Sequence, residues 1–343
     1  VPHGDTHAMA VAINSYLDQP LDEKRRAQLA EFVAKALNFD PYVSALAALA
    51  APTMPFITVA VPNYNYAHYM EQRLGSIFGQ TMPVREILVL DDCSRDDSLA
   101  VISSTAETWD REVQVIVNER NSGSVFAQWR KAAEAASGEF LWIAEADDDT
   151  EPRFLERLVW MLQKDEAIQC AFCDSKSIDT EGEEIWPDYK EYYATVEQDA
   201  LSLDGVYSGA EFIARYMGVK NLILNVSAVV WRRSALIAAL DACGSGLSAY
   251  RLAGDWRLYL EALCAPGAKV AYCADPLNVH RRHSDSVTHG IGNERHINEI
   301  RACHRIARTM AGEDARLAEA QDEYIDEVSS QLAGNRTEKV ESA

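Results

Sequence analysis

The sequence contains no apolar run long enough to cross a bilayer. Its longest apolar stretches, residues 57–61 and 44–51, are far shorter than the roughly 20 residues that a membrane-spanning helix needs. The first residues also lack the basic segment and apolar core of a signal peptide. We therefore expect no transmembrane segment and no cleaved leader, although a chain that begins with valine can equally be a trimmed one.

Positive charge is scarce. The 343 residues include 32 Lys and Arg against 53 Asp and Glu, which gives a net charge of −21. Such a charge repels phosphate backbones and anionic lipid headgroups. We expect no nucleic-acid partner, whereas a nucleotide-sized anion would need backbone amides, a few placed cations or a metal ion to bind.

Cysteine motifs for zinc or disulfides are also lacking. The seven cysteines are odd in number and scattered, and the one CxxC motif, Cys170 to Cys173, lies in an apolar run without a second pair at zinc spacing. We expect reduced, buried thiols of a cytosolic protein.

What the sequence does contain is a regular alternation of short apolar runs with helical patterns. The runs are continuously apolar, as in a parallel sheet that is buried on both faces, and helices of 10 to 15 residues between them imply right-handed crossovers. This pattern predicts a doubly wound, mainly parallel α/β layer. The expected strands are 56–61, 84–90, 113–117, 139–144 and 168–173, and the expected helices are 67–79, 95–108, 124–136 and 152–164.

Helical patterns flank this α/β layer on both sides. We predict an N-terminal helical extension over 1–52, an α/β domain over 53–290 and a C-terminal helical extension over 291–343. Within the domain, the rhythm changes after residue 174. There we expect a hairpin at 179–182, a strand at 225–231, a helix through Asp255 and a strand pair near 269–280.

Ligands of such a sheet bind beyond the carboxyl ends of the strands. At one of these ends, Glu145, Asp147, Asp148 and Asp149 gather four carboxylates whose mutual repulsion must be offset. A divalent Mg²⁺ or Mn²⁺ ion is the natural counter-charge, since it prefers oxygen ligands. The alternative is a solvated helix start, because aspartates before a helix also cap it.

Three further strand ends carry polar residues. Asp91 or Asp92 can accept from a base N–H, and the alternative is that the segment only caps the next helix through Ser94 or Asp96. Asn121 opens a tight turn that suits either a ligand or a plain loop. The segment Pro62-Asn63-Tyr64 can wrap a base, although a lone turn proves little.

Together these four segments resemble, in order and spacing, the inverting family 2 glycosyltransferases of GT-A fold. The match spans about residues 55–175. It implies a nucleotide-diphospho-sugar donor (UDP-, dTDP- or GDP-), a Mn²⁺ or Mg²⁺ ion on its phosphates, and direct displacement by a hydroxyl of a glycan or lipid-linked acceptor. The sequence also resembles modules of bacterial surface-polysaccharide assembly, which implies a place on the cytoplasmic side of the envelope, possible further domains and a division of the domain into a donor half (53–175) and an acceptor half (176–290).

The resemblance also assigns roles to residues. Its base-binding positions fall on Pro62, Asn63, Tyr64, Asp91 or Asp92, with Asn121, Lys131 and Ala146 nearby; its metal-binding DxD motif falls on Glu145 and Asp147, with Asp148 and His283 as further ligands. The glutamate at the first DxD position departs from the family, so Asp147 is the safer ligand.

The remaining roles fall in the acceptor half. Asp255 corresponds to the family's general base, with Gly254 in place of the usual acid; its alternative is a helix cap. Trp256 is expected either to stack on a sugar or to lie in the core. Arg281 and His280 are candidates for the diphosphate, with a plain surface loop as the alternative.

Two other classes of function remain for comparison. A sugar nucleotidyltransferase would need a glycine-rich, basic loop after the first strand, and this chain has none there. An inactive glycan- or nucleotide-binding module would explain Glu145 and Gly254, but the presence of Asp147, Asp255 and His283 favours an enzyme. The sequence leaves open the sugar, the linkage, the oligomeric state and whether the helical extensions dock on the domain.

Overall fold

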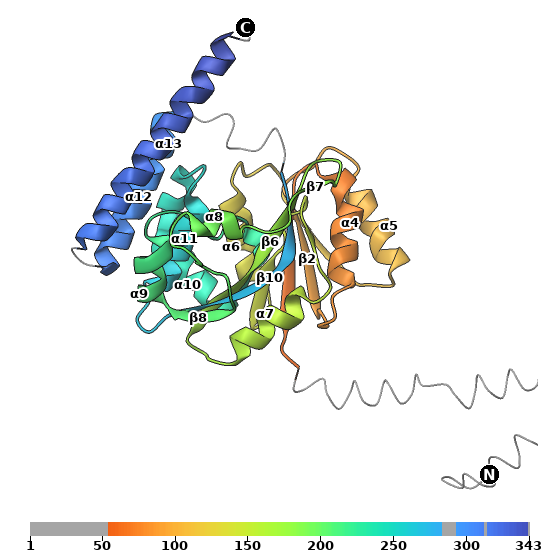
Figure 1. The fold of residues 1–343 in the computed structure, drawn as a ribbon. Helices are drawn as coiled ribbons and strands as arrows, with labels where there is room; N and C mark the ends of the chain where they lie inside the picture. Colours follow the sequence, from red (N-terminus) through yellow and green to blue (C-terminus); the bar gives the residue numbers. More distant parts are fainter. Residues whose placement is uncertain (1–53, 283–292, 312–313, 342–343) are drawn as a thin grey trace, which may run out of the picture. The chain divides into compact units, whose positions relative to one another are not determined.

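The structure is a computed structural model that describes residues 54–282, 293–311 and 314–341 (Figure 1). The N-terminal extension predicted over 1–52 and the candidate ligand His283 lie outside these residues. Residues Pro55–Ala343 form one unit built around a single mixed sheet. Among the described residues, no helix is both long and apolar enough to span a bilayer.

The sheet begins with four parallel strands, as the continuous apolar runs predicted. Their spatial order is β3-β2-β1-β4, followed by β9-β6-β10-β5. β1 is buried along its whole length, because helices cover both of its faces. The bounds are β1 Ile57–Asn63, β2 Glu86–Asp91, β3 Gln114–Val117, β4 Phe140–Ile143, β5 Asp149–Thr150, β6 Ile168–Ile178, β9 Val229–Arg232 and β10 Lys269–Arg281.

The second half of the sheet departs from a purely parallel pattern. β9 lies antiparallel between β4 and β6, and β10 then runs parallel to β6. The strand pair expected near 269–280 is instead one long strand, interrupted by register shifts around Pro276. Proline has no amide hydrogen to donate, so an irregular stretch of a strand accommodates it.

A hairpin follows β6 at the predicted position. Asp179 and Glu183 close it through a backbone hydrogen bond of 2.9 Å, and Gly182 adopts a φ of +90°, which glycine tolerates at no steric cost. The returning strand is β7 (Glu184–Trp186), and a further strand, β8 (Gly205–Ser208), pairs with β10.

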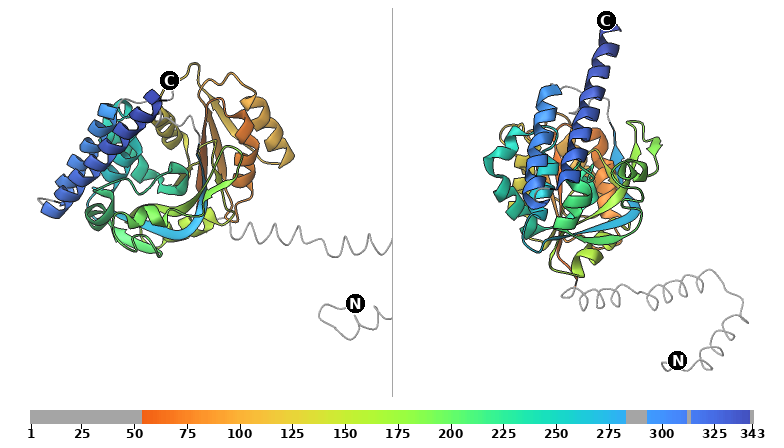
Figure 2. Two further views of the ribbon diagram at one scale, coloured as in Figure 1. Left: turned by 45° about the horizontal axis from the view of Figure 1, so that its top comes forward. Right: turned by 60° about the vertical axis from the view of Figure 1, so that its left-hand side comes forward.

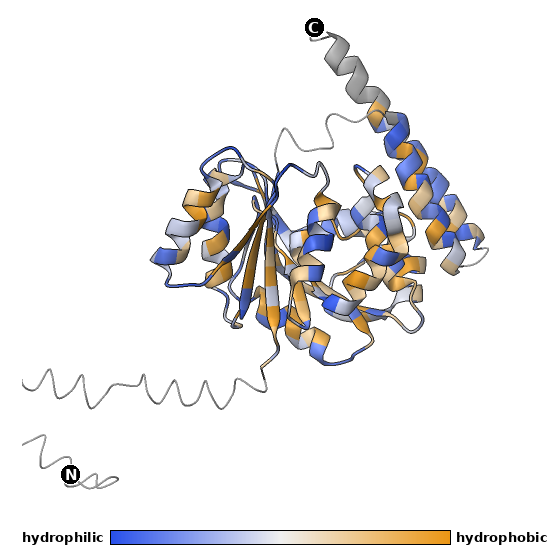
Figure 3. Ribbon diagram, turned by 180° about the vertical axis from the view of Figure 1, so that it is seen from behind, coloured by the Kyte–Doolittle hydropathy of each residue, from blue (hydrophilic) through white to orange (hydrophobic). Residues whose placement is uncertain are grey.

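Two layers of helices cover the sheet, and each has its own core (Figure 3). Alternate residues of a strand enter opposite cores: Val59 packs with the first layer and Ala60 with the second. The first layer contains α4 (Ala67–Phe78), α5 (Ser98–Thr108) and α7 (Phe154–Gln163); the second contains α6 (Val125–Ala135), α8 (Lys190–Ala194), α9 (Gly209–Phe212), η1 (Ile213–Met217), α10 (Arg233–Cys243) and α11 (Gly254–Leu263). Short 3₁₀ turns, η2 (Val226–Ala228) and η3 (Gly244–Ala249), complete this half.

The C-terminal extension is helical, as predicted, and it docks on the domain. Its helices α12 (Asn293–Ala311) and α13 (Ala315–Glu341) lie side by side (Figure 2). Ile300, Cys303 and Ala307 of α12 are buried in the same core as α11. The seven cysteines are all unpaired, and five of them are buried, in agreement with the thiols expected from the sequence.

Candidate active site

The ends of β1 and β2 meet through a buried pair of polar side chains. The Asn63 amide donates to Asp91 Oδ2 at 2.8 Å and to Ser94 Oγ at 3.1 Å. Asp91 Oδ1 accepts the backbone N–H of Ser94 at 2.9 Å, and the Asp91 side chain is almost fully buried. These bonds fix the turn after β2, next to Tyr64, whose side chain is 43% exposed.

Asp92 organises the neighbouring loop. Its oxygens accept from the Asn118 amide at 2.5 Å and from the backbone N–H and hydroxyl of Ser122. Asn118 in turn accepts from the Lys131 ammonium at 2.5 Å. Lys131 therefore supports the loop through Asn118. Sequence reasoning missed Asn118 and Ser122, although both lie within the strand-end segment that it singled out.

The Asn121 turn adopts the tight geometry that the sequence suggested. Asn121 Oδ1 accepts the backbone N–H of Gly123 at 2.7 Å, and Gly123 has a φ of +66°. Arg251 donates to the Gly123 carbonyl at 3.2 Å. This contact joins the turn to the segment that precedes α11.

Glu145 and Asp147 follow β4 at the centre of the sheet. Glu145 Oε1 accepts the indole N–H of Trp129 at 2.9 Å, and burial, reinforced by the charge of Asp147, raises the pKa of Glu145 to about 8. Ala146 between them is buried. The Asp147 carbonyl accepts from Arg281 Nε at 2.9 Å, and its side chain is partly exposed.

Asp148 is buried and bonded to the protein itself, whereas the sequence led us to expect a metal ligand. Its side chain is 3% exposed and accepts from the Asn225 amide at 2.8 Å, the Ser227 hydroxyl at 2.6 Å and the backbone N–H of Arg281 at 3.0 Å. Burial raises the pKa of this carboxyl as well. Asp148 thus ties the segment after β4 to the η2 turn and to β10.

Arg73 supplies a buried positive charge under the acidic cluster. Its guanidinium lies 4.7 Å from the centre of the Trp142 ring, and its Nε and Nη2 atoms have no hydrogen-bond partner among the described residues. Burial lowers the pKa of Arg73, while Asp148, Asp149 and Asp147 oppose that change. Arg73 therefore offsets part of the repulsion among the carboxylates. The signal for it was an arginine on the apolar face of α4 formed by Met70, Leu74 and Ile77.

The oxygen ligands present suit a divalent ion whose coordination shell is completed by a bound substrate. Within the described residues, no three His, Cys, Asp or Glu side chains gather closely enough to hold a metal ion by themselves. Mg²⁺ and Mn²⁺ sites commonly use one or two carboxylates and complete the shell with water and substrate phosphates. Glu145 and Asp147 fit that arrangement.

Asp255 lies in the first turn of α11 and borders the same hollow as Glu145. It accepts from the Asn221 amide at 3.0 Å, and burial raises its pKa to about 6. A hollow of about 240 Å³ is lined by Asp255 and Glu145 together. The other walls of the hollow include Phe126, Trp129, Leu224, Asn225, Val226 and Arg251.

The glycine before Asp255 is required by packing. A Cβ atom at Gly254 would lie 2.3 Å from the ring of Phe126 and 3.0 Å from Tyr250 Cβ. Any side chain here would displace Phe126, which walls the hollow. The departure from the family's acidic residue therefore has a local steric reason.

Trp256 belongs to the core, the second of its two expected roles. Its ring is 3% exposed, its indole N–H donates to the Met217 carbonyl at 2.8 Å, and His304 packs against it edge-on. A sugar cannot stack on this ring unless α11 moves.

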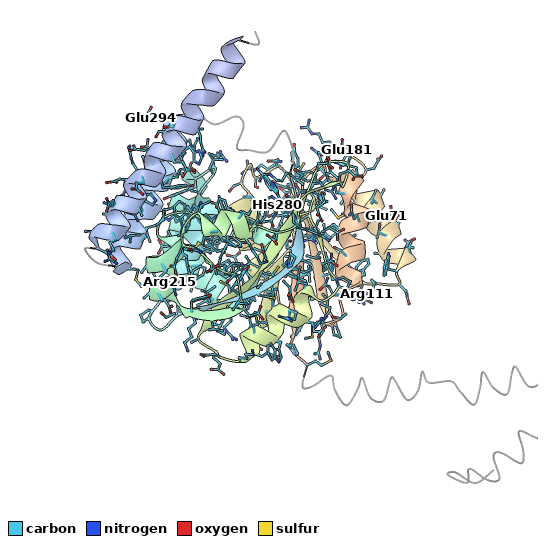
Figure 4. The ribbon with its side chains drawn as sticks, viewed as in Figure 1. Glu71, Arg111, Glu181, Arg215, His280 and Glu294 are labelled. Carbon is cyan, nitrogen blue, oxygen red and sulfur yellow. The ribbon has the colours of Figure 1, made fainter. Side chains whose placement is uncertain are left out.

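Arg281 is also committed to the protein itself, which differs from the expected contact with a diphosphate. It is 5% exposed and donates to the carbonyls of Asp147 and Asp179 and to Gln72 Oε1. His280 lies at the C-terminal end of β10, half-buried, with Nδ1 2.9 Å from the Tyr189 hydroxyl (Figure 4). Of this pair, His280 is the one nearer to solvent.

The fold is that of GT-A glycosyltransferases. Two solved structures share it: Staphylococcus aureus TarS (residues 1–349) in complex with UDP-GlcNAc, at a TM-score of 0.59 and 18% identity over 79% of this chain and 71% of that chain, and the Pyrobaculum calidifontis mannosyltransferase PcManGT in complex with GDP-Man and Mn²⁺, at a TM-score of 0.54 and 16% identity over 82% and 76%. At these identities the likeness concerns the fold alone.

Residues 58–214 match the model of Glycosyl transferase family 2, which identifies a domain of that family within the chain. It is 27% identical over 177 residues to the putative teichuronic acid biosynthesis glycosyltransferase TuaG of Bacillus subtilis, covering 51% of this chain and 62% of TuaG. It is also 23% identical over 141 residues to the chondroitin synthase of Pasteurella multocida, covering 40% of this chain but only 14% of that enzyme. The chain thus spans less than two thirds of the length of these relatives. The resemblance stated from the four motifs is confirmed at the level of family and fold.

Proposed function

We propose that this protein transfers a sugar from a nucleotide-diphospho-sugar to a hydroxyl group of a glycan or lipid-linked acceptor, with inversion at the anomeric carbon, in the assembly of a polysaccharide. The observation that carries the proposal is the hollow of about 240 Å³ that Asp255 and Glu145 line together at the carboxyl ends of the strands. A candidate base and a candidate metal-binding carboxylate thus border one space whose volume is sufficient for a sugar ring.

The donor is assigned to the half of the site formed by β1, β2 and β4. Tyr64 offers an exposed ring face for a base, next to the turn that Asn63 and Asp91 hold. Asp147 and Glu145 are the residues that would hold a divalent cation, which neutralises the charge of a departing diphosphate when it is bound. The ligands of the two solved structures, UDP-GlcNAc in TarS and GDP-Man with Mn²⁺ in PcManGT, support this assignment.

The acceptor is assigned to the half near α11. The Asp255 carboxylate takes the proton of the acceptor hydroxyl, the acceptor oxygen forms a bond to the anomeric carbon, and the bond from that carbon to the diphosphate oxygen breaks. A single displacement from the face opposite the leaving group inverts the anomeric centre. Phe126 and other apolar side chains form part of the wall beside this step.

The first experiment is calorimetric titration of the protein with UDP, dTDP and GDP, each in Mn²⁺ and in EDTA. We expect one nucleotide to bind in Mn²⁺ and to lose most of its affinity in EDTA. Transfer assays with sugars of that nucleotide then test the activity itself. Binding of no nucleotide under either condition would reject the transferase and favour an inactive binding module.

Transfer should also depend on the ionisation of Asp255. A general base must be deprotonated, and burial raises the pKa of Asp255 to about 6, so the acid form predominates below that pH. We expect kcat/KM for the acceptor to fall tenfold per pH unit below about pH 6 and to level off above it. A flat profile between pH 5 and 7 would argue that Asp255 is not the base.

A further inference from the structure

A carboxylate from the C-terminal extension reaches the backbone just before Asp255. Glu299 of α12 is 7% exposed. Its Oε1 accepts the N–H of Arg251 at 2.9 Å, and its Oε2 accepts the N–H groups of Leu252 at 2.8 Å and Ala253 at 3.0 Å. Three successive amides are thus bound by one side chain that lies 46 to 48 residues away in sequence.

These contacts anchor the segment that leads into a helix without a side-chain cap. Helix α11 begins at Gly254, and its N-cap residue, Ala253, has no side chain that could accept an amide hydrogen. A negative charge near a helix N-terminus is also stabilised by the helix dipole. Glu299 therefore fixes the start of the helix whose second residue is Asp255.

The same helical pair holds the other segment that touches Asp255. His304 Nε2 lies 2.7 Å from the Val219 carbonyl, and Gln321 of α13 donates to the Gly218 carbonyl at 2.7 Å. The loop fixed in this way leads to Asn221, which donates to Asp255 at 3.0 Å. The segment that precedes Asp255 and the loop that carries its partner Asn221 are therefore both held by α12 and α13.

We propose that Glu299 is a positioning residue for the transfer reaction, and that α12 and α13 form part of the catalytic apparatus because they set the place of Asp255. This inference rests on the proposed function. It assigns no contact with substrate to Glu299, which acts through the backbone of Arg251 to Ala253. Misplacement of a reacting group by about 1 Å can cost on the order of 100-fold in rate.

Glu299 also influences Asp255 through its charge. Asn221, from the loop after η1, donates a hydrogen bond to Asp255, and the groups that interact with it electrostatically are Tyr192 from α8, Tyr259 from α11 itself, and Glu299 and Cys303 from α12. The negative charge of Glu299 raises the pKa of Asp255. Removing that charge should therefore move the acid limb of the rate profile to lower pH.

The test compares Glu299→Ala and Glu299→Gln with the wild type and with Ser208→Ala. Ser208→Ala is the matched control, because it disturbs the start of another helix, α9. It removes the cap of that helix, in which the Glu211 N–H donates to Ser208 Oγ at 3.2 Å. The measurements are kcat, KM, nucleotide affinity, the pH profile of kcat/KM, and amide hydrogen exchange of the peptide that covers residues 251–263.

We expect Glu299→Ala to lower kcat about 10- to 100-fold, with unchanged nucleotide affinity and faster exchange over residues 251–263. Glu299→Gln keeps one acceptor oxygen, so it should retain more activity and shift the acid limb to lower pH. Ser208→Ala should leave kcat and the limb unchanged.

The inference is overturned if both Glu299 variants keep wild-type kcat and pH profile while the wild type is active, and the proposed function then stands. It is also overturned if Ser208→Ala loses as much kcat, because loss of stability would then explain the effect. If Glu299→Ala does not fold, the rate and pH profile of Glu299→Gln decide alone. A wild type that binds no nucleotide and transfers no sugar rejects the proposed function, and the catalytic role of Glu299 with it.

Discussion

Replacement of Asp255 by asparagine should lower kcat by two to four orders of magnitude and leave nucleotide binding unchanged. General-base catalysis contributes typically about 10²–10⁴-fold to a rate, and asparagine cannot accept the proton of the acceptor hydroxyl. Nucleotide binding is spared because the contacts assigned to the donor come from β1, β2 and β4, whereas Asp255 lies on α11. The measurements are steady-state transfer with the identified donor and calorimetric titration of its nucleotide.

The variant also separates loss of catalysis from loss of folding. Burial raises the pKa of Asp255 to about 6, above its value of about 3.9 in an unfolded chain, so the folded state prefers the protonated form. The stability that this preference contributes is present below about pH 4 and is lost as the pH rises through about 6. At pH 7 the wild type therefore bears the cost of a buried charge that asparagine removes.

Thermal unfolding at pH 7 should consequently show Asp255→Asn to be at least as stable as the wild type. A suitable control is Glu261→Gln on the same helix, since Glu261 faces Arg257 at 3.6 Å. We expect the control to keep both kcat and stability. If Asp255→Asn retained wild-type transfer, another group would be the base.

The grouping of the residues assigned to the donor could be predicted from sequence, because parallel strands bring their carboxyl ends to one edge of the sheet. The residues that follow β1, β2 and β4 must meet at one edge of the sheet, so the strand pattern alone was enough to group Asn63, Asp91 and Glu145. The direction of β9 could not be predicted in the same way. A strand such as Val229–Arg232, apolar in its first three residues, has the same pattern whether it runs parallel or antiparallel to its neighbours.

The acceptor side depends on contacts between residues far apart in the chain. Glu299 is one of two acids in α12, a helix rich in charged residues, and nothing in its local pattern distinguishes a residue that binds the amides before α11 from one that faces solvent. Trp256 was equally compatible with a binding surface and a core, because periodicity places a residue on a face of a helix without showing what covers that face. The docking of α12 and α13 decides both cases.

The acidic cluster illustrates the same limit at shorter range. Four neighbouring carboxylates follow β4, but their contacts differ: Asp148 binds the η2 segment and β10, and Asp149 accepts from Gln72 at 2.7 Å. Of the four, we assign the cation to Glu145 and Asp147, the two positions of the DxD motif. The sequence revealed that carboxylates gather at this strand end. The hydrogen bonds of each side chain then indicate which carboxylates hold the structure together and which we assign to the cation.

Replacement of Asp147 by alanine should abolish metal-dependent nucleotide binding. Residues that merely orient metal ligands cost about 10–100-fold in affinity when mutated, so loss of a ligand should cost more than about 100-fold. Titration of the nucleotide in Mn²⁺ measures this loss, and in EDTA the variant and the wild type should bind equally weakly. The second condition matters, because a variant that simply unfolds would lose the residual binding too.

Asp149→Asn is the matched control for this prediction. It removes one negative charge two residues away. The amide oxygen of the new asparagine can still accept the hydrogen bond that Gln72 donates to Asp149. We expect it to keep metal-dependent binding, since the effect should follow ligation and not the total charge of the cluster. If Asp149→Asn lost that binding and Asp147→Ala kept it, the cation would belong at the start of β5, and the division of roles within the cluster would have to be reversed.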